Sequence, residues 1–232
     1  MEDFIKKILN SIYLTFIFEK RYRFFLEGLG NTLVLTLASF LIGTLFAIIL
    51  CAMARSENKT LNRLSKFITS LFVEIPSMVL LMIMVYIIFG RTILPVLLVV
   101  IFGLSLKTGA YLAEIFYTAI STVSPGEIEA ARTLGMSKWQ AFRLVMLPQA
   151  VETALPLYKN QFIFTMQETS IVGYLAIIDL TRASSIVSSR TMDAFFGLIS
   201  VTIIYFVIGF TAKKFFDLFG KQKHIKEEEV KV

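Results

Sequence analysis

The stretch LGNTLVLTLASFLIGTLFAIILCAMA, residues 29–54, contains no charged side chain and is followed directly by Arg55. A membrane-spanning helix needs roughly 20 mostly apolar residues to cross the ~30 Å hydrocarbon layer of a bilayer. We therefore predict that this stretch is a transmembrane helix, and that the protein is an all-α integral membrane protein.

The composition of the whole chain supports this prediction. Of its 232 residues, 56% are hydrophobic and only 17% are charged, against about 25% charged in an average soluble domain. A mean hydropathy of +0.73 excludes an intrinsically disordered chain. With one cysteine and one histidine, the chain has neither a disulfide framework nor a His/Cys metal cluster of its own.

Four further apolar runs follow the first one and bring the expected number of transmembrane spans to five. They cover residues 67–90, 92–120, 151–178 and 194–212. These spans define an expected membrane domain over residues 28–216, with a tail at residues 217–232. Within the preceding segment, 1–27, the apolar residues 8–18 are too few to span. We expect an interfacial helix there, with a partial sixth span as the alternative.

The distribution of basic residues selects an orientation for these spans. With the N-terminus outside and the C-terminus in the cytoplasm, the inner segments hold 13 Lys and Arg and the outer segments hold 8. Cytoplasmic loops of membrane proteins carry an excess of Lys and Arg. The loop 55–66, with only Glu57 opposing its four basic residues, contributes most to this assignment, and the basic N-terminus opposes it.

The polar stretch STVSPGEIEAARTLGMSKWQAFRLVMLP, residues 121–148, separates the third and fourth runs. Ser124 followed by Glu127 is typical of a capping box, with Pro125 at the first helical position. Gly135 is a typical helix stop. This part of the stretch therefore predicts a short helix that ends in a tight turn at Gly135.

A second short helix is expected after the turn, because Ser137 followed by Gln140 forms another capping-box pattern. It should end near Pro148. Each helix has an apolar side, consisting of Ile128, Ala131 and Leu134 on the first and of Trp139, Phe142 and Val145 or Met146 on the second. Two capped amphipathic helices offer a docking surface for a protein partner. A plain connecting hairpin and a DNA-binding helix-turn-helix are alternatives, although the loop is hardly basic.

The same loop resembles the EAA loop of ABC-importer permeases. The resemblance is carried, at the family's spacing, by Glu129-Ala130-Ala131, Gly135, Val145 and Leu147-Pro148. In that family the loop forms coupling helices, which sit in a groove of the ATPase subunit. The resemblance implies an ATPase-coupling role for Glu129, Ala130, Ala131, Gly135, Leu147 and Pro148.

Other motifs are similar to those of permeases for polar amino acids. They are Gly30-Asn31-Thr32-Leu33, Ala110-Tyr111-Leu112-Ala113-Glu114-Ile115, Leu147-Pro148-Gln149-Ala150, Leu155-Pro156 with Asn160, and Thr169-Ser170. The resemblance implies a type I importer permease in a bacterial cytoplasmic membrane, working with a second permease subunit, identical or related, two ATPase subunits and an external amino-acid-binding protein. Departures from the family pattern, such as Val73-Glu74-Ile75-Pro76, leave the substrate open, and another small solute is the alternative.

The fourth run is the most polar of the five and contains the candidate substrate path. Its candidate residues are Glu168, Asn160, Gln161, Thr169 and Ser170. Ionisable groups at bilayer depth are costly, so they usually face a protein interior or an aqueous path. Glu168 could meet an α-ammonium group, and the others could hydrogen-bond a zwitterion. Hydrogen bonding between helices is the alternative role for each of them. Lys107 and Glu114, on one face of the third run, are expected to pair with each other or across a subunit interface.

The sequence contains no Walker-type phosphate loop, and we see no nucleophile or metal site. We therefore expect a transport subunit that is not an enzyme, binds no cofactor or nucleic acid itself, and depends on ATP hydrolysis by a separate ATPase.

Overall fold

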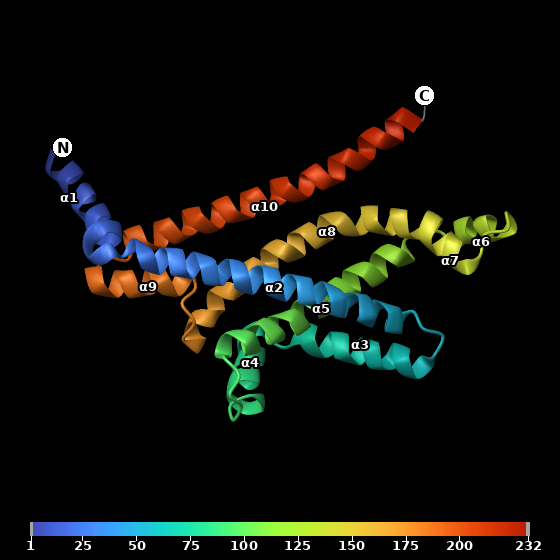
Figure 1. Cartoon of the computed structure of the whole chain (residues 1–232), viewed down its shortest axis with the longest axis horizontal. Coiled ribbons are helices and arrows are strands. Elements are labelled where there is room, and N and C mark those ends of the chain that lie inside the picture. The colour runs from blue at the N-terminus through green and yellow to red at the C-terminus, as the bar shows by residue number, and fades with distance from the viewer. Residues whose placement is uncertain (1, 231–232) are drawn as a thin grey trace. The chain divides into compact units, whose positions relative to one another are not determined.

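The computed structural model describes the backbone of residues 2–230 and the side chains of residues 5–218. Within this part, all regular secondary structure is helical (Figure 1), which confirms the predicted all-α class. The internal contacts divide the chain into two compact units. The first unit comprises Met1–Leu37, Met82–Val100 and Met166–Val232, and the second comprises Ala38–Leu81 and Ile101–Thr165.

Three helices are long and apolar enough to cross a membrane by themselves. They are α2 (Tyr22–Ala54), α5 (Val96–Ser121) and the Phe195–Leu218 portion of α10 (Phe195–Val230). They correspond to the predicted runs 29–54, 92–120 and 194–212. Since α5 starts only after Pro95, residues 92–95 lie outside it. In α10 the helix continues into the expected tail, whose side chains from residue 219 onward lie outside the described residues.

The predicted run 67–90 is not one helix. It consists of α3 (Lys59–Glu74), then α4 (Ser77–Met82) continuing as the π-helix η3 (Ile83–Ile88), and the axis turns by 103° between α3 and this second part. The cause is Pro76, which lacks a backbone N–H and forces the preceding residue out of the helical region. The pair is a broken span or a re-entrant segment.

Two side chains of α5 satisfy carbonyl groups that the break leaves without helical partners. The Nζ atom of Lys107, a residue only 4% exposed, donates to the carbonyl oxygen of Ile75. The hydroxyl of Tyr111 donates to the carbonyl oxygen of Val73 over 3.3 Å. The break is therefore held by specific hydrogen bonds within the second unit.

The predicted run 151–178 also departs from a single helix. The α-helix α8 (Leu147–Glu168) tightens into the 3₁₀-helix η5 (Thr169–Leu175), and Ala176 then takes a left-handed conformation with φ 61°. A separate helix, α9 (Leu180–Thr191), follows where the sequence suggested only an outer connecting segment. The two parts count together as a second bent pair, so the described chain has three to five candidate spans.

A buried aspartate starts α9 in the first unit. The carboxylate of Asp179, which is fully buried, accepts hydrogen bonds from the backbone N–H of Thr181 (2.9 Å) and of Arg182 (3.0 Å). The hydroxyl of Tyr205 on α10 lies 3.5 Å from the same carboxylate. Because an N-cap acceptor satisfies backbone donors that have no helical partner, Asp179 fixes the first residue of α9.

Side chains of α2 hold the same turn from the other side. Asn31 donates from Nδ2 to the carbonyl oxygen of Ile178 over 2.8 Å, and Thr32 accepts from the backbone N–H of Leu180 over 3.3 Å. Beside them, a hydrophobic core forms from residues of α2, α9 and α10: Phe25, Leu180, Ala183, Val187 and Val201. Asn31 and Thr32 thus have structural roles within the first unit.

The second unit is built on close packing of α2 against α5. A Cβ atom at Gly109 would lie 2.7 Å from the carbonyl oxygen of Gly43, so the two backbones need glycine where they touch. Helix α8 joins α5 through the hydroxyls of Thr108 and Thr165, which are 3.1 Å apart. These contacts hold the helices that carry the candidate site.

The N-terminal segment contains α1 (Glu2–Ile12), the π-helix η1 (Tyr13–Ile17) and the 3₁₀-helix η2 (Phe18–Lys20). Its chain reverses at Glu19 and Lys20, which both have positive φ. The buried guanidinium of Arg21 stabilises this reversal by donating to the Leu14 carbonyl oxygen over 2.8 Å. A short helix is present as predicted, and α1 alone is too short to cross a bilayer.

Candidate functional site

The stretch after α5 forms a helical hairpin, defined here as residues 125–146. It comprises α6 (Pro125–Thr133), α7 (Lys138–Ala141) and the π-helix η4 (Phe142–Met146), and α6 packs against both α7 and η4. Gly135 lies between the helices with φ +90°. Two helical segments with a turn at Gly135 are therefore present where the sequence predicts them.

The turn itself is a Schellman motif. The backbone N–H of Met136 donates to the carbonyl oxygen of Ala131 (3.2 Å), and that of Gly135 donates to the carbonyl oxygen of Arg132 (3.0 Å). This pattern satisfies the last carbonyl groups of a helix and requires a left-handed residue, which is usually glycine. No neighbouring atom lies within 4 Å of the place that a Cβ atom would take at Gly135, so backbone conformation is what favours glycine there.

The capping box predicted for the second helix is formed. The backbone N–H of Gln140 donates to Oγ of Ser137 over 3.2 Å, and the backbone N–H of Ser137 donates to Oε1 of Gln140 over 2.8 Å. Both orphan donors at the start of α7 are therefore satisfied by side chains within the hairpin.

The capping box predicted for the first helix is absent. Ser124 occupies the N-cap position and Pro125 the first helical position, but the Ser124 side chain makes no capping hydrogen bond. Glu127 instead accepts a hydrogen bond from the side-chain amide of Gln149, near the start of α8. This contact links the first helix of the hairpin to the start of α8.

The predicted end of the second helix near Pro148 is also wrong. The helical backbone continues from α7 through η4 into α8, with Leu147 in a right-handed helical conformation. A π-helical turn changes the hydrogen-bonding register, and such turns accommodate local breaks in a helix. The π-helical turn at Phe142–Met146 ends two residues before Pro148, and Pro148 lies in the first turn of α8 without ending the helix. The hairpin and α8 thus share one continuous helical backbone.

Three large apolar side chains of the hairpin are exposed, and we call them the apolar patch. They are Leu134 (82% exposed), Trp139 (65%) and Leu144 (60%). The Trp139 ring stacks on Phe142 with 5.6 Å between the ring centroids. Ala131 and Ala141 are buried. The apolar residues therefore divide into an inward set that closes the hairpin and an outward patch, of which Leu144 was not predicted.

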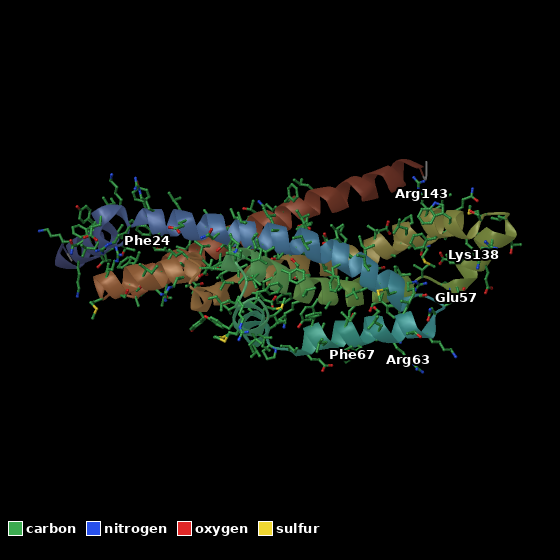
Figure 2. All side chains as sticks on the ribbon, turned by 60° about the horizontal axis from the view of Figure 1, so that its bottom comes forward. Phe24, Glu57, Arg63, Phe67, Lys138 and Arg143 are labelled. Atoms are coloured by element: carbon green, nitrogen blue, oxygen red, sulfur yellow. The ribbon has the colours of Figure 1, made fainter. Side chains whose placement is uncertain are left out.

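The hairpin lies at the same end of the second unit as the loop between α2 and α3. Figure 1 shows α6, α7 and this loop toward the same end, and Figure 2 shows Glu57 of the loop toward the end that holds Lys138 and Arg143 of the hairpin. Both connections were predicted to be cytoplasmic, and the shared end agrees with a common side of the membrane.

The residues expected to couple to an ATPase have different environments. Glu129, Ala130 and Gly135 are exposed, Ala131 is buried, Leu147 is partly exposed and Pro148 is half-buried. The exposed members could contact a partner directly, whereas Ala131 contributes to the packing of the hairpin.

The candidate substrate-path residues of the second unit do not share one environment. Asn160 and Phe164 are exposed, while Gln161 and Thr165 are buried. Thr165 donates to the carbonyl oxygen of Gln161 over 2.9 Å and faces Thr108. In this part of α8, Thr165 therefore lies in the contact with α5, whereas Asn160 lies on an exposed face.

In the first unit, Thr169 is fully buried and donates to the carbonyl oxygen of Met166 over 2.7 Å. Glu168 and Ser170 are half-buried. On α5 of the second unit, Lys107 is buried while Glu114 is exposed, so their expected common face does not give them a common environment. Among the described residues, no group of three or more His, Cys, Asp or Glu could hold a metal ion.

The described residues thus form helices only, with several candidate spans and an exposed helical hairpin between two of them, as expected for a membrane transport subunit. A family model described as "Binding-protein-dependent transport system inner membrane component" matches residues 39–224. The chain therefore belongs to this family of transport-system inner membrane components.

Individual relatives agree with the family match. The chain is 32% identical over 200 residues to the probable amino-acid permease protein YxeN of Bacillus subtilis (strain 168), covering 84% of this chain and 89% of the relative. It is 30% identical over 215 residues to the histidine/lysine/arginine/ornithine transport system permease protein HisM of Salmonella typhimurium, covering 88% and 91%.

Solved structures have the same fold. A crystal structure of an amino acid ABC transporter with histidines matches with a TM-score of 0.80 and 33% identity, covering 88% of this chain and 96% of that one. The MetNI methionine ABC transporter in an inward-facing form shares the fold alone, with a TM-score of 0.68 and 22% identity. The expected type I ABC permease fold is confirmed at this level.

Family membership confirms the predicted class of function. The chain is an inner-membrane permease subunit of an ABC transport system, and it is a transport subunit rather than an enzyme. In such a system, a separate subunit hydrolyses ATP. The system also includes a binding protein.

Proposed function

We propose that this chain forms the translocation pathway of an importer for a polar amino acid. Relatives named as amino-acid permeases, together with the solved amino acid transporter of the same fold, support this substrate class. Transport proceeds by alternating access: ATP closes the ATPase subunits, the helical hairpin follows, and the pathway reopens to the outside. The chain binds no cofactor, and its partner uses the ATP.

The proposed topology has five spans, with the N-terminus outside and the C-terminus in the cytoplasm. In this arrangement, residues 28–216 form the permease domain, residues 1–27 lie at the outer surface of the membrane and residues 217–232 form a cytoplasmic tail. The two bent pairs, each counted as one span, give five together with the three long helices. Exposed apolar side chains of the N-terminal segment, including Ile5, Leu9 and Ile17, support its interfacial position.

The observation that carries the coupling role is the apolar patch on a hairpin whose backbone continues into α8. Exposed aromatic and aliphatic anchors on rigid helices are typical of a protein docking surface. The Schellman turn, the formed capping box and the Glu127–Gln149 contact make the hairpin stiff. A stiff hairpin passes a displacement of its partner directly to α8.

The assembly proposed around the chain contains two permease subunits, identical or closely related, with two ATPases on the hairpins and an amino-acid-binding protein on the outer side. Along the pathway we propose Glu168 as the contact for the substrate α-ammonium group. Asn160, Gln161, Thr169 and Ser170 are the remaining candidates, and the buried ones contact substrate only if the pathway opens beside them.

The coupling role is tested by two substitutions in the reconstituted complex. Gly135→Ala places a side chain at φ +90°, which costs about 1–2 kcal/mol and disturbs the turn. Glu129→Ala removes an exposed carboxylate from the proposed docking surface. Both should lower substrate-stimulated ATP hydrolysis or assembly with the ATPase.

Gly126→Ala is the matched control for this test, because Gly126 lies within α6 and its nearest neighbouring atom is 3.7 Å from an added Cβ. It should leave stimulation unchanged. Normal stimulation in both the Gly135→Ala and Glu129→Ala variants would contradict the coupling role.

The substrate contact is tested by Glu168→Ala, with Gln167→Ala as a neighbouring control. Amino acid uptake by Glu168→Ala should fall severalfold while the complex still assembles, and Gln167→Ala should transport normally. Unchanged affinity and rate in Glu168→Ala would assign this residue a structural role. A ligand screen with the external binding protein distinguishes an amino acid from another small solute.

A further inference from the structure

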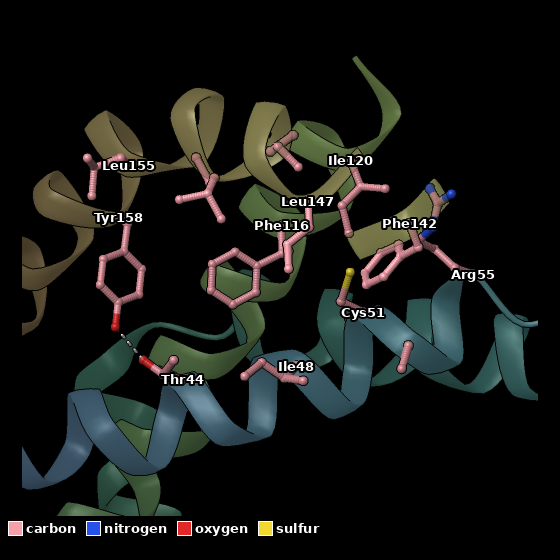
Figure 3. Close-up of a pocket in the computed structure, with 15 residues that line it drawn as sticks. Thr44, Ile48, Cys51, Arg55, Phe116, Ile120, Phe142, Leu147, Leu155 and Tyr158 are labelled. Atoms are coloured by element: carbon pink, nitrogen blue, oxygen red, sulfur yellow. Dashed lines mark hydrogen bonds between the residues drawn. The ribbon is translucent and has the colours of Figure 1, made fainter. Parts of the chain in front are cut away.

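The second unit contains a cavity of about 710 Å³ that the transport function does not explain. It is bounded by α2, α5, the end of the hairpin and the first part of α8, and Figure 3 shows the side chains that line it. Most of the lining is apolar, with Ile48, Phe116, Ile120, Phe142 and Leu155 among its walls. Cavities of roughly 300–1,000 Å³ hold small ligands, and an apolar one excludes charged solutes such as a zwitterionic amino acid.

The two ends of the cavity differ in chemistry. At one end, the hydroxyls of Thr44 and Tyr158 lie 3.0 Å apart and satisfy each other. At the other end, Arg55 follows directly after the last residue of α2 and lines the cavity next to Phe142 (Figure 3). Arg55 is therefore the charged residue of the cavity lining, and it lies at the end where α2 leaves its apolar stretch.

The length of the cavity can be estimated along α2. Arg55 lies eleven positions after Thr44, which corresponds to about 16 Å at the helical rise of ~1.5 Å per residue. The hydrocarbon layer is about 30 Å thick, so one leaflet contributes about 15 Å. A cavity that follows this part of α2 is therefore long enough to hold an acyl chain across one leaflet, with the Arg55 guanidinium at the headgroup end.

We propose that this cavity binds one acyl chain of an anionic phospholipid, whose phosphate group pairs with Arg55. The apolar walls shield the acyl chain from water. The planar guanidinium of Arg55 can donate two parallel hydrogen bonds to phosphate oxygens. Basic residues at the mouth of pockets between transmembrane helices recognise anionic headgroups in this way. The bound chain touches Phe142 and Leu147, at the junction of the hairpin with α8.

The experiment is native mass spectrometry of the permease complex, purified in mild detergent with its ATPase and supplied with equal amounts of phosphatidylglycerol and phosphatidylcholine. The unaltered complex should retain phosphatidylglycerol in preference. Arg55→Gln should reduce this preference about fivefold, the effect of one basic residue near an anionic surface. Ala52→Phe, at an exposed alanine that lines the cavity, should reduce retention of both lipids by filling the space.

Two control variants accompany these substitutions. Lys59→Gln makes the same change of charge outside the cavity, and Leu45→Phe enlarges an exposed side chain of α2 that does not line it. Both controls should retain lipid like the unaltered complex. Equal retention of the two lipids by the unaltered complex would overturn the proposal. So would an unchanged preference in Arg55→Gln, or full retention in an assembled Ala52→Phe complex.

Discussion

The two ends of α8 are held in different ways. At its start, the helix continues from a hairpin whose turn and cap are made by residues close in sequence, and whose apolar patch is exposed. At its end, it passes into a buried 3₁₀ segment, and the following helix is fixed by Asp179 and by side chains of α2 that are distant in sequence. The first end offers a surface to a partner, whereas the second is anchored inside its own unit.

This difference predicts that substitutions at the two ends fail in different ways. Changes at the hairpin should lower coupling in a protein that still folds. Changes at the start of α9 should lower stability first, with transport lost as a consequence.

The largest effect is expected for Asp179→Ala. It leaves two part-buried backbone N–H groups without an acceptor, which costs about 1–3 kcal/mol in the free energy of unfolding. The melting temperature of the detergent-solubilised permease should fall markedly. Asp193→Ala is the matched control, since Asp193 accepts only one, exposed backbone bond, from Phe195 at 2.9 Å. Equal losses in the two variants would show that burial of the Asp179 cap does not matter.

A smaller effect separates the two capping serines of the hairpin. Ser137→Ala removes a formed capping box and should cost about 1 kcal/mol of local stability. Ser124→Ala should be nearly neutral, because the Ser124 side chain makes no capping bond. Hydrogen exchange of the α7 backbone amides should become faster only in Ser137→Ala. Faster exchange in both variants, or in neither, would contradict the difference between the two caps.

Local patterns made most of the hairpin predictable. The turn at Gly135 and the cap of Ser137 and Gln140 are formed by residues at most five positions apart, so the local sequence contains the relevant partners. The Ser124–Glu127 box had the same pattern but was not formed. Glu127 contacts Gln149, which lies 22 residues further along and could not be identified from local spacing.

The spans show the same limit. The charge-free stretch of α2 was predicted because apolar length is a property of the sequence itself. At Pro76 the residue that breaks the second run was visible, but its carbonyl partners Lys107 and Tyr111 come from another helix. Helix α9 was missed although its N-cap residue, Asp179, directly precedes it; the side chain that holds the turn before it, Asn31, is 147 residues from Ile178.

Two basic residues of the proposed outer segments have structural partners, which reduces the conflict with the positive-inside rule. Arg21 is buried and bonded to the Leu14 carbonyl oxygen, and the guanidinium of Arg190 lies 5.0 Å from the ring centroid of Phe24. Both contacts use the positively charged guanidinium within the fold, so these two arginines need not reflect the orientation of the chain in the membrane.

The central claim, that the hairpin docks an ATPase, is tested most directly by photo-crosslinking from its apolar patch. Cys51 is the single cysteine of the chain, so Cys51→Ala allows one benzophenone-maleimide label at Leu134→Cys, or at Phe206→Cys on the exposed face of α10. In the assembled complex, the label at position 134 should crosslink to the ATPase subunit, and the label at position 206 should not. Crosslinking to the ATPase from position 206 alone, or from neither position, would contradict the account.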